Sequence, residues 1–452
     1  MSSTGCTARC SRRCRRRGGR PVRTEHASGA GLASAAGLAP AAGLASTAAP
    51  AARLGDPLGM LPTVELAPHQ ARLLMHRAGG TPVYAYSRAA LRQAVDRVRA
   101  ASVPGAEIYY SLKANPHPGV VTALASLVDG FDVCSLGELE TALNAGMPPE
   151  KLLFTGPAKS AGEAAAALAG GVAVTVESPR QAVLFAETAR RLGVGGRAVI
   201  RVNTPYPGRT SGAAPSPNQF GVFAGDTAEV VRVLRASPLS LSGLQLFWGS
   251  QYSDAEVIRA ARNAALDRAA SLADEFGLSL DFVSVGGGIA MPWCDRDTAV
   301  DWEGLRSDGP GPGPTADGPL GSATVVCEYG RSIVGPAGVL LTSVLDVKTI
   351  DSRRYVLVDA GMNHVMIASR LVAGAGRGEP LVRAVDPKDP GALSPAVVTG
   401  PLCSQLDVLA QDVLLPAVDV GDALMFSGVG AYGPTFSPSA FLSRDEVKEI
   451  VF

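Results

Sequence analysis

Short apolar stretches alternate with amphipathic helical stretches through the middle of this 452-residue chain. Eight of them recur at intervals of about 20–40 residues, and each ends in polar or glycine residues. They read EIYYSLKA, FDVCS, LLFTGP, AVTVESP, AVIRVN, GLQLFWGS, FVSVGGG and TVVCEYGR. Strands that alternate with helices favour a parallel sheet, and eight repeats predict an α/β fold of the (β/α)8 TIM-barrel type. The polar strand ends would then meet at one face of the barrel and form its functional site.

Other parts of the chain have a different pattern. From about residue 335 helical patterns become scarce, and several β-rich stretches predict a separate C-terminal β domain over 335–452. We expect the barrel to span 96–334, with a Pro/Gly/Asp-rich loop insertion at 291–320 before its last strand. Residues 61–95 contain a short strand (82–86) and a helix with Ser87 as N-cap, and we expect them to pack with the β domain.

Residues 1–60 resemble neither domain. The first 24 residues contain eight arginines and no acid, and an Ala/Gly-rich repeat follows. A segment without large side chains to bury is expected to stay disordered. An export or transit address and a nucleic-acid-binding arm are two other interpretations of an arginine-rich leader.

The composition of the chain limits the binding partners and the cellular compartment that we expect for the protein. The 41 basic and 41 acidic residues cancel, so the chain as a whole has no charge that would attract nucleic acid or an acidic membrane. Of the seven cysteines, three lie in the N-terminal tail. The other four, Cys134, Cys294, Cys327 and Cys403, show neither a CxxC pair nor a metal-ligand spacing, which favours a reducing, cytoplasmic location and no bound metal. We find no unbroken apolar run long enough to cross a membrane.

Five motifs contain candidate functional residues, and four of them have a plain structural alternative. Lys113, at the end of a predicted strand, is either a solvated charge or a nucleophile toward carbonyl groups. The run Gly286, Gly287 and Gly288 is either a flexible turn or a backbone cradle for phosphate. Cys403 is either a small core residue or a proton donor.

The last barrel strand ends in CEYGR, with Glu328 and Arg331 on either side of a glycine. These residues form a surface ion pair or serve opposite ends of one cofactor. In the second case the carboxylate would keep a ring nitrogen protonated and the guanidinium would bind phosphate. The glycine-flanked Tyr432 is expected to be partly exposed.

Together and in this order, the motifs resemble those of fold-type III pyridoxal-phosphate decarboxylases, the group that includes ornithine and diaminopimelate decarboxylase. The resemblance runs from about residue 80 to the C terminus. It rests on YYSLKANPHP, FDVCSLGELE, FGV, GSQ, GGG, CEYGR, DAGMNH, GPLCSQLD and GAYG. It implies a barrel that binds pyridoxal 5′-phosphate, followed by a β domain like that of alanine racemase.

The resemblance also implies roles for individual residues. Lys113 would tether the cofactor, and Glu328 would contact the pyridinium nitrogen. Cys403 would protonate the carbon that loses carbon dioxide, from the second subunit of a homodimer with shared active sites. The other implied cofactor-binding residues are Asp132, Phe247, Ser250, Gly286, Gly287, Gly288, Arg331 and Tyr432, and the implied substrate-binding residues are Ser404 and Asp407.

The chain departs from the family at positions that read the far end of the substrate. Ser404 stands where diamine-type members have an acid, and Ile367 stands near the arginine of diaminopimelate decarboxylases. Phe247 replaces a histidine that stacks on the cofactor, and Gln219 replaces a lysine that pairs across the dimer.

These changes are similar to those in decarboxylases of biosynthetic clusters, of which one acts on glutamyl groups attached to an acyl-carrier protein. The chain is therefore predicted to decarboxylate an L-amino acid or amino-acyl group with an uncharged or thioester-linked far end. The alternatives are a diaminopimelate-, ornithine- or lysine-type decarboxylase, an amino-acid racemase, a non-catalytic regulator of the antizyme-inhibitor kind and a cofactor-homeostasis barrel.

Overall fold

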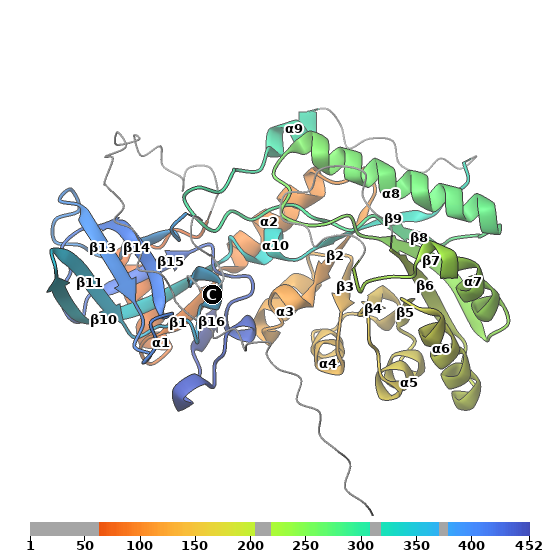
Figure 1. Cartoon of the computed structure of the whole chain (residues 1–452), viewed down its shortest axis with the longest axis horizontal. Helices are drawn as coiled ribbons and strands as arrows, with labels where there is room; N and C mark the ends of the chain where they lie inside the picture. The colour runs from red at the N-terminus through yellow and green to blue at the C-terminus, as the bar shows by residue number, and fades with distance from the viewer. Residues whose placement is uncertain (1–62, 204–217, 308–317, 370–377) are drawn as a thin grey trace, which may run out of the picture. The chain divides into compact units, whose positions relative to one another are not determined.

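The computed structural model describes residues 63–203, 218–307, 318–369 and 378–452 (Figure 1). Eight parallel strands close into a barrel in sequence order, because the first of them pairs with both the second and the last. The predicted barrel and β-sheet fold is therefore confirmed. The barrel strands are β2 (Glu107–Ser111), β3 (Gly130–Val133), β4 (Leu152–Phe154), β5 (Ala173–Val176), β6 (Gly196–Val202), β7 (Leu239–Leu246), β8 (Phe282–Ser284) and β9 (Thr324–Tyr329).

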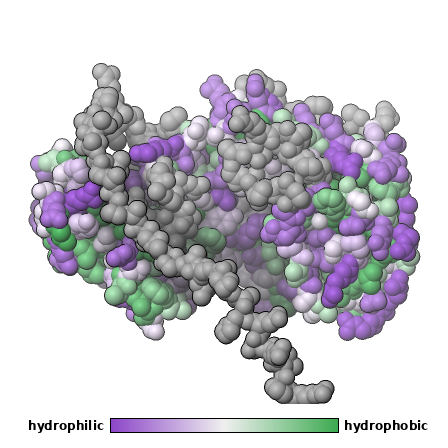
Figure 2. Space-filling view, in the orientation of Figure 1, coloured by the Kyte–Doolittle hydropathy of each residue, from purple (hydrophilic) through white to green (hydrophobic). Residues whose placement is uncertain are grey.

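Helices lie on the outside of these strands (Figure 1). Most begin where the sequence supplies a cap: Ser135, Ser160 and Ser178 each accept a backbone N–H of the following helix. On the face shown in Figure 2, many hydrophilic residues cover the barrel helices. The helices are α2 (Arg88–Ala100), α3 (Pro118–Ala125), α4 (Leu136–Asn144), α5 (Ala161–Ala169), α6 (Pro179–Leu192), α7 (Thr227–Arg235), α8 (Ala255–Phe276), α9 (Trp302–Ser307) and α10 (Arg331–Val334).

The predicted loop insertion at 291–320 contains the short helix α9, so it is not a loop throughout. Leu305 of this helix is fully buried, which explains why a Pro/Gly/Asp-rich region still forms a helical turn. Residues 308–317 of the insertion lie outside the described residues, as does the predicted 1–60 tail.

A second, eight-stranded sheet contains strands from both ends of the chain. Its main path runs in the order β12-β15-β10-β11-β13-β14, and β1 joins β10 to β16. Its members are β1 (Val83–Tyr86), β10 (Gly338–Ile350), β11 (Arg353–Val358), β12 (Val382–Ala384), β13 (Ser394–Thr399), β14 (Val408–Leu415), β15 (Ala423–Ser427) and β16 (Lys448–Val451), with α1 (Pro68–Arg77) preceding β1.

The short strand β1 is fully buried and pairs antiparallel with β10 and parallel with β16. Ser87, at its end, accepts the N–H of Ala90 and caps α2, as predicted. The sheet thus receives a strand from the segment that leads into the barrel. The boundaries proposed for the domains stay a prediction.

The largest fully buried side chains of the core are aromatic. Tyr110, Phe131 and Phe154, from three neighbouring barrel strands, are fully buried, and the rings of the first two meet edge to face at 6.2 Å. Burying one such ring contributes roughly 1.5–3 kcal/mol. Among the described residues, no helix has the length and apolar character needed to cross a membrane.

Candidate active site

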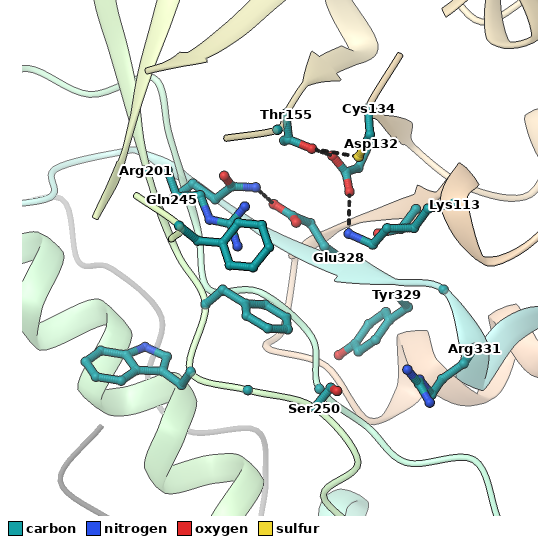
Figure 3. A pocket seen from close by; sticks show the side chains of 18 of the residues that line it. Lys113, Asp132, Cys134, Thr155, Arg201, Gln245, Ser250, Glu328, Tyr329 and Arg331 are labelled. Carbon is teal, nitrogen blue, oxygen red and sulfur yellow. Dashed lines mark hydrogen bonds and ion pairs between the residues drawn. The ribbon is translucent and has the colours of Figure 1, made fainter. Parts of the chain in front are cut away.

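A cavity of about 720 Å³ lies at the carboxyl ends of the barrel strands. This is the face at which a barrel of this type is expected to carry its site. Residues from all but one of the strand ends line it, and Figure 3 shows several of their side chains converging. Of the predicted residues, Lys113, Asp132, Phe247, Ser250, Gly288, Glu328, Arg331 and Tyr432 line the cavity, whereas Gly286, Gly287, Cys403, Ser404 and Asp407 do not.

Lys113 lies in a single 3-10 turn (Leu112–Ala114) directly after β2. The turn is fixed by Asn115, whose side chain donates to the carbonyl of Gly430 and whose own carbonyl accepts the hydroxyl of Tyr110. The Lys113 side chain is 51% exposed because it faces the open cavity. The strand therefore stops where a lysine amine is presented to a ligand.

The Nζ atom of Lys113 lies 3.5 Å from Oδ2 of Asp132, a carboxylate that is almost fully buried. Partial burial of the amine lowers the pKa of Lys113, but the charge of Asp132 outweighs it and raises the pKa above its ordinary value. The lysine is thus held as a cation in this structure.

A hydrogen bond to Oδ1 orients the carboxylate of Asp132, whose Oδ2 faces Lys113. Thr155, after β4, donates to Oδ1 at 2.6 Å, and the same hydroxyl lies 3.2 Å from the sulfur of Cys134. Oδ2 has no hydrogen bond, so its contact among the described residues is the ion pair with Lys113. Burial raises the pKa of Cys134 to about 12, so its thiol stays protonated.

Glu328 projects from β9 opposite this pair. Its Oε1 atom accepts hydrogen bonds from Gln245 at 2.7 Å and from Ser284 at 2.5 Å. Burial and the nearby Asp132 raise the pKa of Glu328, while the two hydrogen bonds act in the opposite direction. Since both bonds end on Oε1, Oε2 is the oxygen available to a ligand in the cavity.

The glycine run follows β8, and each position has a distinct constraint. A Cβ on Gly287 would lie 1.9 Å from the carbonyl oxygen of Glu328, so the strand β9 passes too close for any other residue. Gly288 has φ of +83°, which favours glycine, and it reaches the cavity wall. The run is thus a packed turn with one glycine at the cavity wall.

Ser250, Arg331 and Tyr432 line the cavity together with Gly288. Figure 3 shows Ser250 and Arg331 on the side of the cavity away from Thr155 and Cys134. The backbone N–H of Tyr432 donates to the carbonyl of Ala114 at 2.7 Å, next to Lys113. A loop of the β domain therefore completes the wall.

The sequence reasoning missed a charged cluster behind the cavity. Glu177, after β5, accepts the N–H groups of Gly156 (3.0 Å) and Gly221 (2.9 Å), which belong to loops that follow β4 and β6. Its Oε1 atom lies 3.9 Å from Nζ of Lys159 and 3.6 Å from the guanidinium of Arg201. Only the predicted strand end AVTVESP hinted at Glu177, as the acid directly after the strand.

Arg201 brings this cluster to the cavity surface. It projects from β6, lines the cavity and packs over the ring of Phe220 at 4.6 Å and over that of Phe247 at 5.9 Å. Phe247 is 44% exposed and lines the cavity, as expected for a residue that stacks on a planar ligand.

The buried amine of Lys159 should make the free energy of unfolding depend on pH. It is 2% exposed and donates to the carbonyls of Gly156 and Thr175, and burial lowers its pKa to about 8. The folded state therefore binds fewer protons than the unfolded state between about pH 8 and pH 10.5, so this residue makes stability rise with pH in that window.

We expect the difference in unfolding free energy between the wild type and Lys159→Met to change by about 3 kcal/mol across this window. Urea titrations at several pH values would measure it. The exposed pair formed by Lys388 and Asp419 supplies the control, because Lys388→Met removes a lysine without a buried environment. A difference between wild type and Lys159→Met that stays constant from pH 7.5 to 10.5 would contradict the expectation.

Cys403 lies in an exposed loop between β13 and β14, away from the cavity of its own chain. Ser404 accepts the N–H of Leu406. Asp407 is buried and accepts the N–H groups of Met362 (2.6 Å) and Leu402 (2.8 Å), and burial raises its pKa. In this chain, Asp407 thus joins two loops, and none of the three residues reaches Lys113.

The family model for pyridoxal-dependent decarboxylases, pyridoxal binding domain, matches residues 88–335. This range contains the whole barrel and more than half of the chain. The chain belongs to the pyridoxal-dependent decarboxylases.

Named relatives extend the similarity into the β domain. The chain is 32% identical to the diaminopimelate decarboxylase of Helicobacter pylori over 381 residues, which covers 82% of this chain and 90% of the relative. It is 27% identical to the L-glutamyl-[BtrI acyl-carrier protein] decarboxylase of Niallia circulans, with 82% and 88% covered. The solved structure of the Helicobacter pylori diaminopimelate decarboxylase complexed with L-lysine matches with a TM-score of 0.72 and 30% identity, covering 84% of this chain and 94% of that one.

The side chains that line the cavity of this decarboxylase are chemically suited to pyridoxal phosphate. An amine, a buried carboxylate with one unbonded oxygen, and a guanidinium line the same cavity, and they suit an aldehyde, a ring nitrogen and a phosphate respectively. The exposed phenyl face of Phe247 suits the ring between them. When bound, the cofactor supplies an electron sink for the pair left behind by the departing carboxylate.

Proposed function

We propose that this decarboxylase acts on an amino acid or amino-acyl group whose far end is uncharged or thioester-linked, as on an acyl-carrier protein, within a specialised biosynthetic pathway. The observation that carries the proposal is the absence of charge at Ser404 and Ile367, where the family reads the far end. Ile367 is buried, at 6% exposure, in a short turn after the DAGMNH motif. The Niallia circulans relative, named for a carrier-protein substrate, supports the same direction.

In this proposal each of the cavity residues has a separate role in binding or catalysis. Lys113 would hold the cofactor through its amine, at the position that the amine of the substrate would then take. Glu328 keeps the ring nitrogen protonated, and Ser250, Gly288, Arg331 and Tyr432 bind the phosphate. The bond between Cα and the carboxylate breaks, carbon dioxide leaves, and a proton returns to Cα from the thiol of Cys403.

Because Cys403 is exposed and distant from its own cavity, the proposal requires it to come from a second copy of the chain. Large apolar side chains are exposed close to it in sequence or near the segment that contacts its loop: Leu406 at 48% and Leu442 at 49%. Arg444 donates to the carbonyl of Pro401, which places the segment around 441–444 beside the cysteine loop. A homodimer would cover this surface and complete both sites.

Turnover of free diaminopimelate is the second candidate, because the chain shares more identity with diaminopimelate decarboxylases than with the carrier-protein enzyme. Arg201 is the residue that favours it. Its guanidinium lines the cavity and is a partner for a distal carboxylate.

A substrate comparison separates the candidates. We expect thioester-linked glutamyl and similar groups on a carrier protein to have higher kcat/KM than free ornithine, lysine or diaminopimelate, by roughly tenfold to a hundredfold, since the free amino acids would lack a charge-assisted bond. Carbon dioxide release and the amine product would both be measured.

Ser404→Asp is the matched variant, because it adds the acid that diamine-type members carry. It should raise kcat/KM for ornithine and lysine and should not raise kcat/KM for the preferred substrate. Efficient wild-type turnover of free diaminopimelate would sink the carrier-protein proposal and favour the second candidate. A D-amino acid as product would instead indicate a racemase.

A further inference from the structure

The guanidinium of Arg331 lies over two aromatic rings. Its central carbon is 4.8 Å from the ring of Trp293 and 4.8 Å from the ring of Tyr432. Arg331 itself begins α10, just after the last barrel strand. The two rings come from different places, one from the loop after the glycine run and the other from the β domain.

The loop that carries Trp293 is fixed at several points. Its backbone N–H donates to Asp297 at 2.7 Å, which closes a tight turn. The next residues attach to the β domain: the N–H of Asp295 donates to the carbonyl of Glu379, and the carboxylate of Asp295 accepts the N–H of Glu379. The indole is therefore held by a loop that the β domain supports.

Tyr432 is held equally firmly. Its φ of +54° is uncommon for a residue with a side chain, and its N–H bond to Ala114 keeps it there. Phe436 packs edge to face against its ring at 6.1 Å. Both rings around Arg331 thus have their own supports.

A guanidinium that lies over two rings is attracted to both ring faces and has few rotamers left. The two contacts therefore restrict the directions in which its N–H groups point. Arg331 lines the cavity, and in the proposed function it binds the phosphate of the cofactor. A fixed fork of N–H groups suits the geometry of a phosphate.

We propose that Trp293 is a positioning residue that, together with Tyr432, holds the guanidinium of Arg331 ready for the phosphate group of pyridoxal phosphate. This inference rests on the proposed role of Arg331. Trp293 does not line the cavity, so it acts through the arginine.

The test compares two ligands that differ by the phosphate. For Trp293→Ala we expect the Kd for pyridoxal phosphate to rise roughly fivefold to thirtyfold, whereas the Kd for pyridoxal, which lacks phosphate, should hardly change. Trp293→Phe keeps a ring over the guanidinium and should recover most of the affinity. Titrations followed by the visible absorption of the bound ligand give both constants without any measurement of turnover.

Two variants make the outcome specific. Trp302→Ala removes a similar pair, in which Arg97 lies 5.4 Å from the ring of Trp302 outside the cavity, and should leave both constants unchanged. Arg331→Ala should weaken the binding of pyridoxal phosphate more than Trp293→Ala does.

If Arg331→Ala weakens cofactor binding and Trp293→Ala does not, the positioning role is wrong and the proposed function stands. If Trp293→Ala weakens both ligands equally, the role is structural and the inference fails. If Arg331→Ala has no effect, the phosphate assignment itself is wrong.

Discussion

Replacing Lys113 with alanine should abolish the visible absorption of covalently held pyridoxal phosphate and lower kcat by roughly 10³-fold or more. The amine lies at the end of β2, faces the cavity and lies 3.5 Å from Asp132. Within the cavity, no other lysine of the described residues is available to replace it. Absorption spectra of the purified protein with added cofactor, followed by kcat measurements, would check both parts.

Lys151→Ala is the matched control, because Lys151 also pairs with an acid, Glu107 at 2.7 Å, but stands before β4 at the opposite end of the strands. It should keep full absorption and activity.

Mixing the Lys113→Ala and Cys403→Ala variants tests whether the active site is shared between subunits. If subunits exchange, one of the two sites in a mixed dimer has both residues intact, and activity should return. Persistent inactivity of mixtures that are shown to exchange subunits would contradict the proposed contribution of Cys403 from the second copy.

Replacing Glu177 with leucine should lower the free energy of unfolding by about 3–5 kcal/mol. The carboxylate is buried and accepts two backbone N–H groups, and it lies near two cations, Lys159 and Arg201. Its removal leaves two buried positive charges and two N–H groups without this partner. Urea unfolding at neutral pH would measure the loss.

The control for Glu177→Leu is Glu107→Leu, which breaks a shorter but partly exposed pair and should cost less than about 1 kcal/mol. The double variant of Glu177→Leu with Lys159→Met should recover part of the loss, because one unpaired charge disappears with its partner. Equal costs for the buried and the exposed pair would show that the Glu177 cluster is not the structural centre that its geometry indicates.

The sequence pattern was sufficient for the barrel because strand ends are local signals. Each of the eight predicted stretches became a barrel strand, and the polar residue at the end of β2, β3 or β9 reached the cavity as expected. Lys113 and Glu328 could be found this way, since a barrel brings the ends of all its strands together.

Long-range partners left no such signal. Lys159 and Arg201 are single charges on separate parts of the chain, and only the closed barrel brings them to Glu177. Trp293 lies in what the composition indicated to be a featureless insertion, yet contacts with the β domain bring it against Arg331. Spacing along a sequence does not encode a contact that depends on two domains.

The position of β1 has a consequence for the order in which the protein can be completed during synthesis. The hydroxyl of Tyr86, at the end of β1, donates to Glu449, which lies 363 residues later in the chain. The strand β1 therefore cannot gain its partner β16 until the chain has been synthesised through residue 451. A nascent chain that has emerged only to residue 335 contains every barrel strand and Lys113 but neither Tyr432 nor β16. At typical translation speeds of roughly 5–20 residues per second, it would wait several seconds for them. The lysine would therefore be in place before the wall that encloses its cofactor, and capture of pyridoxal phosphate would be among the last events in the maturation of the protein.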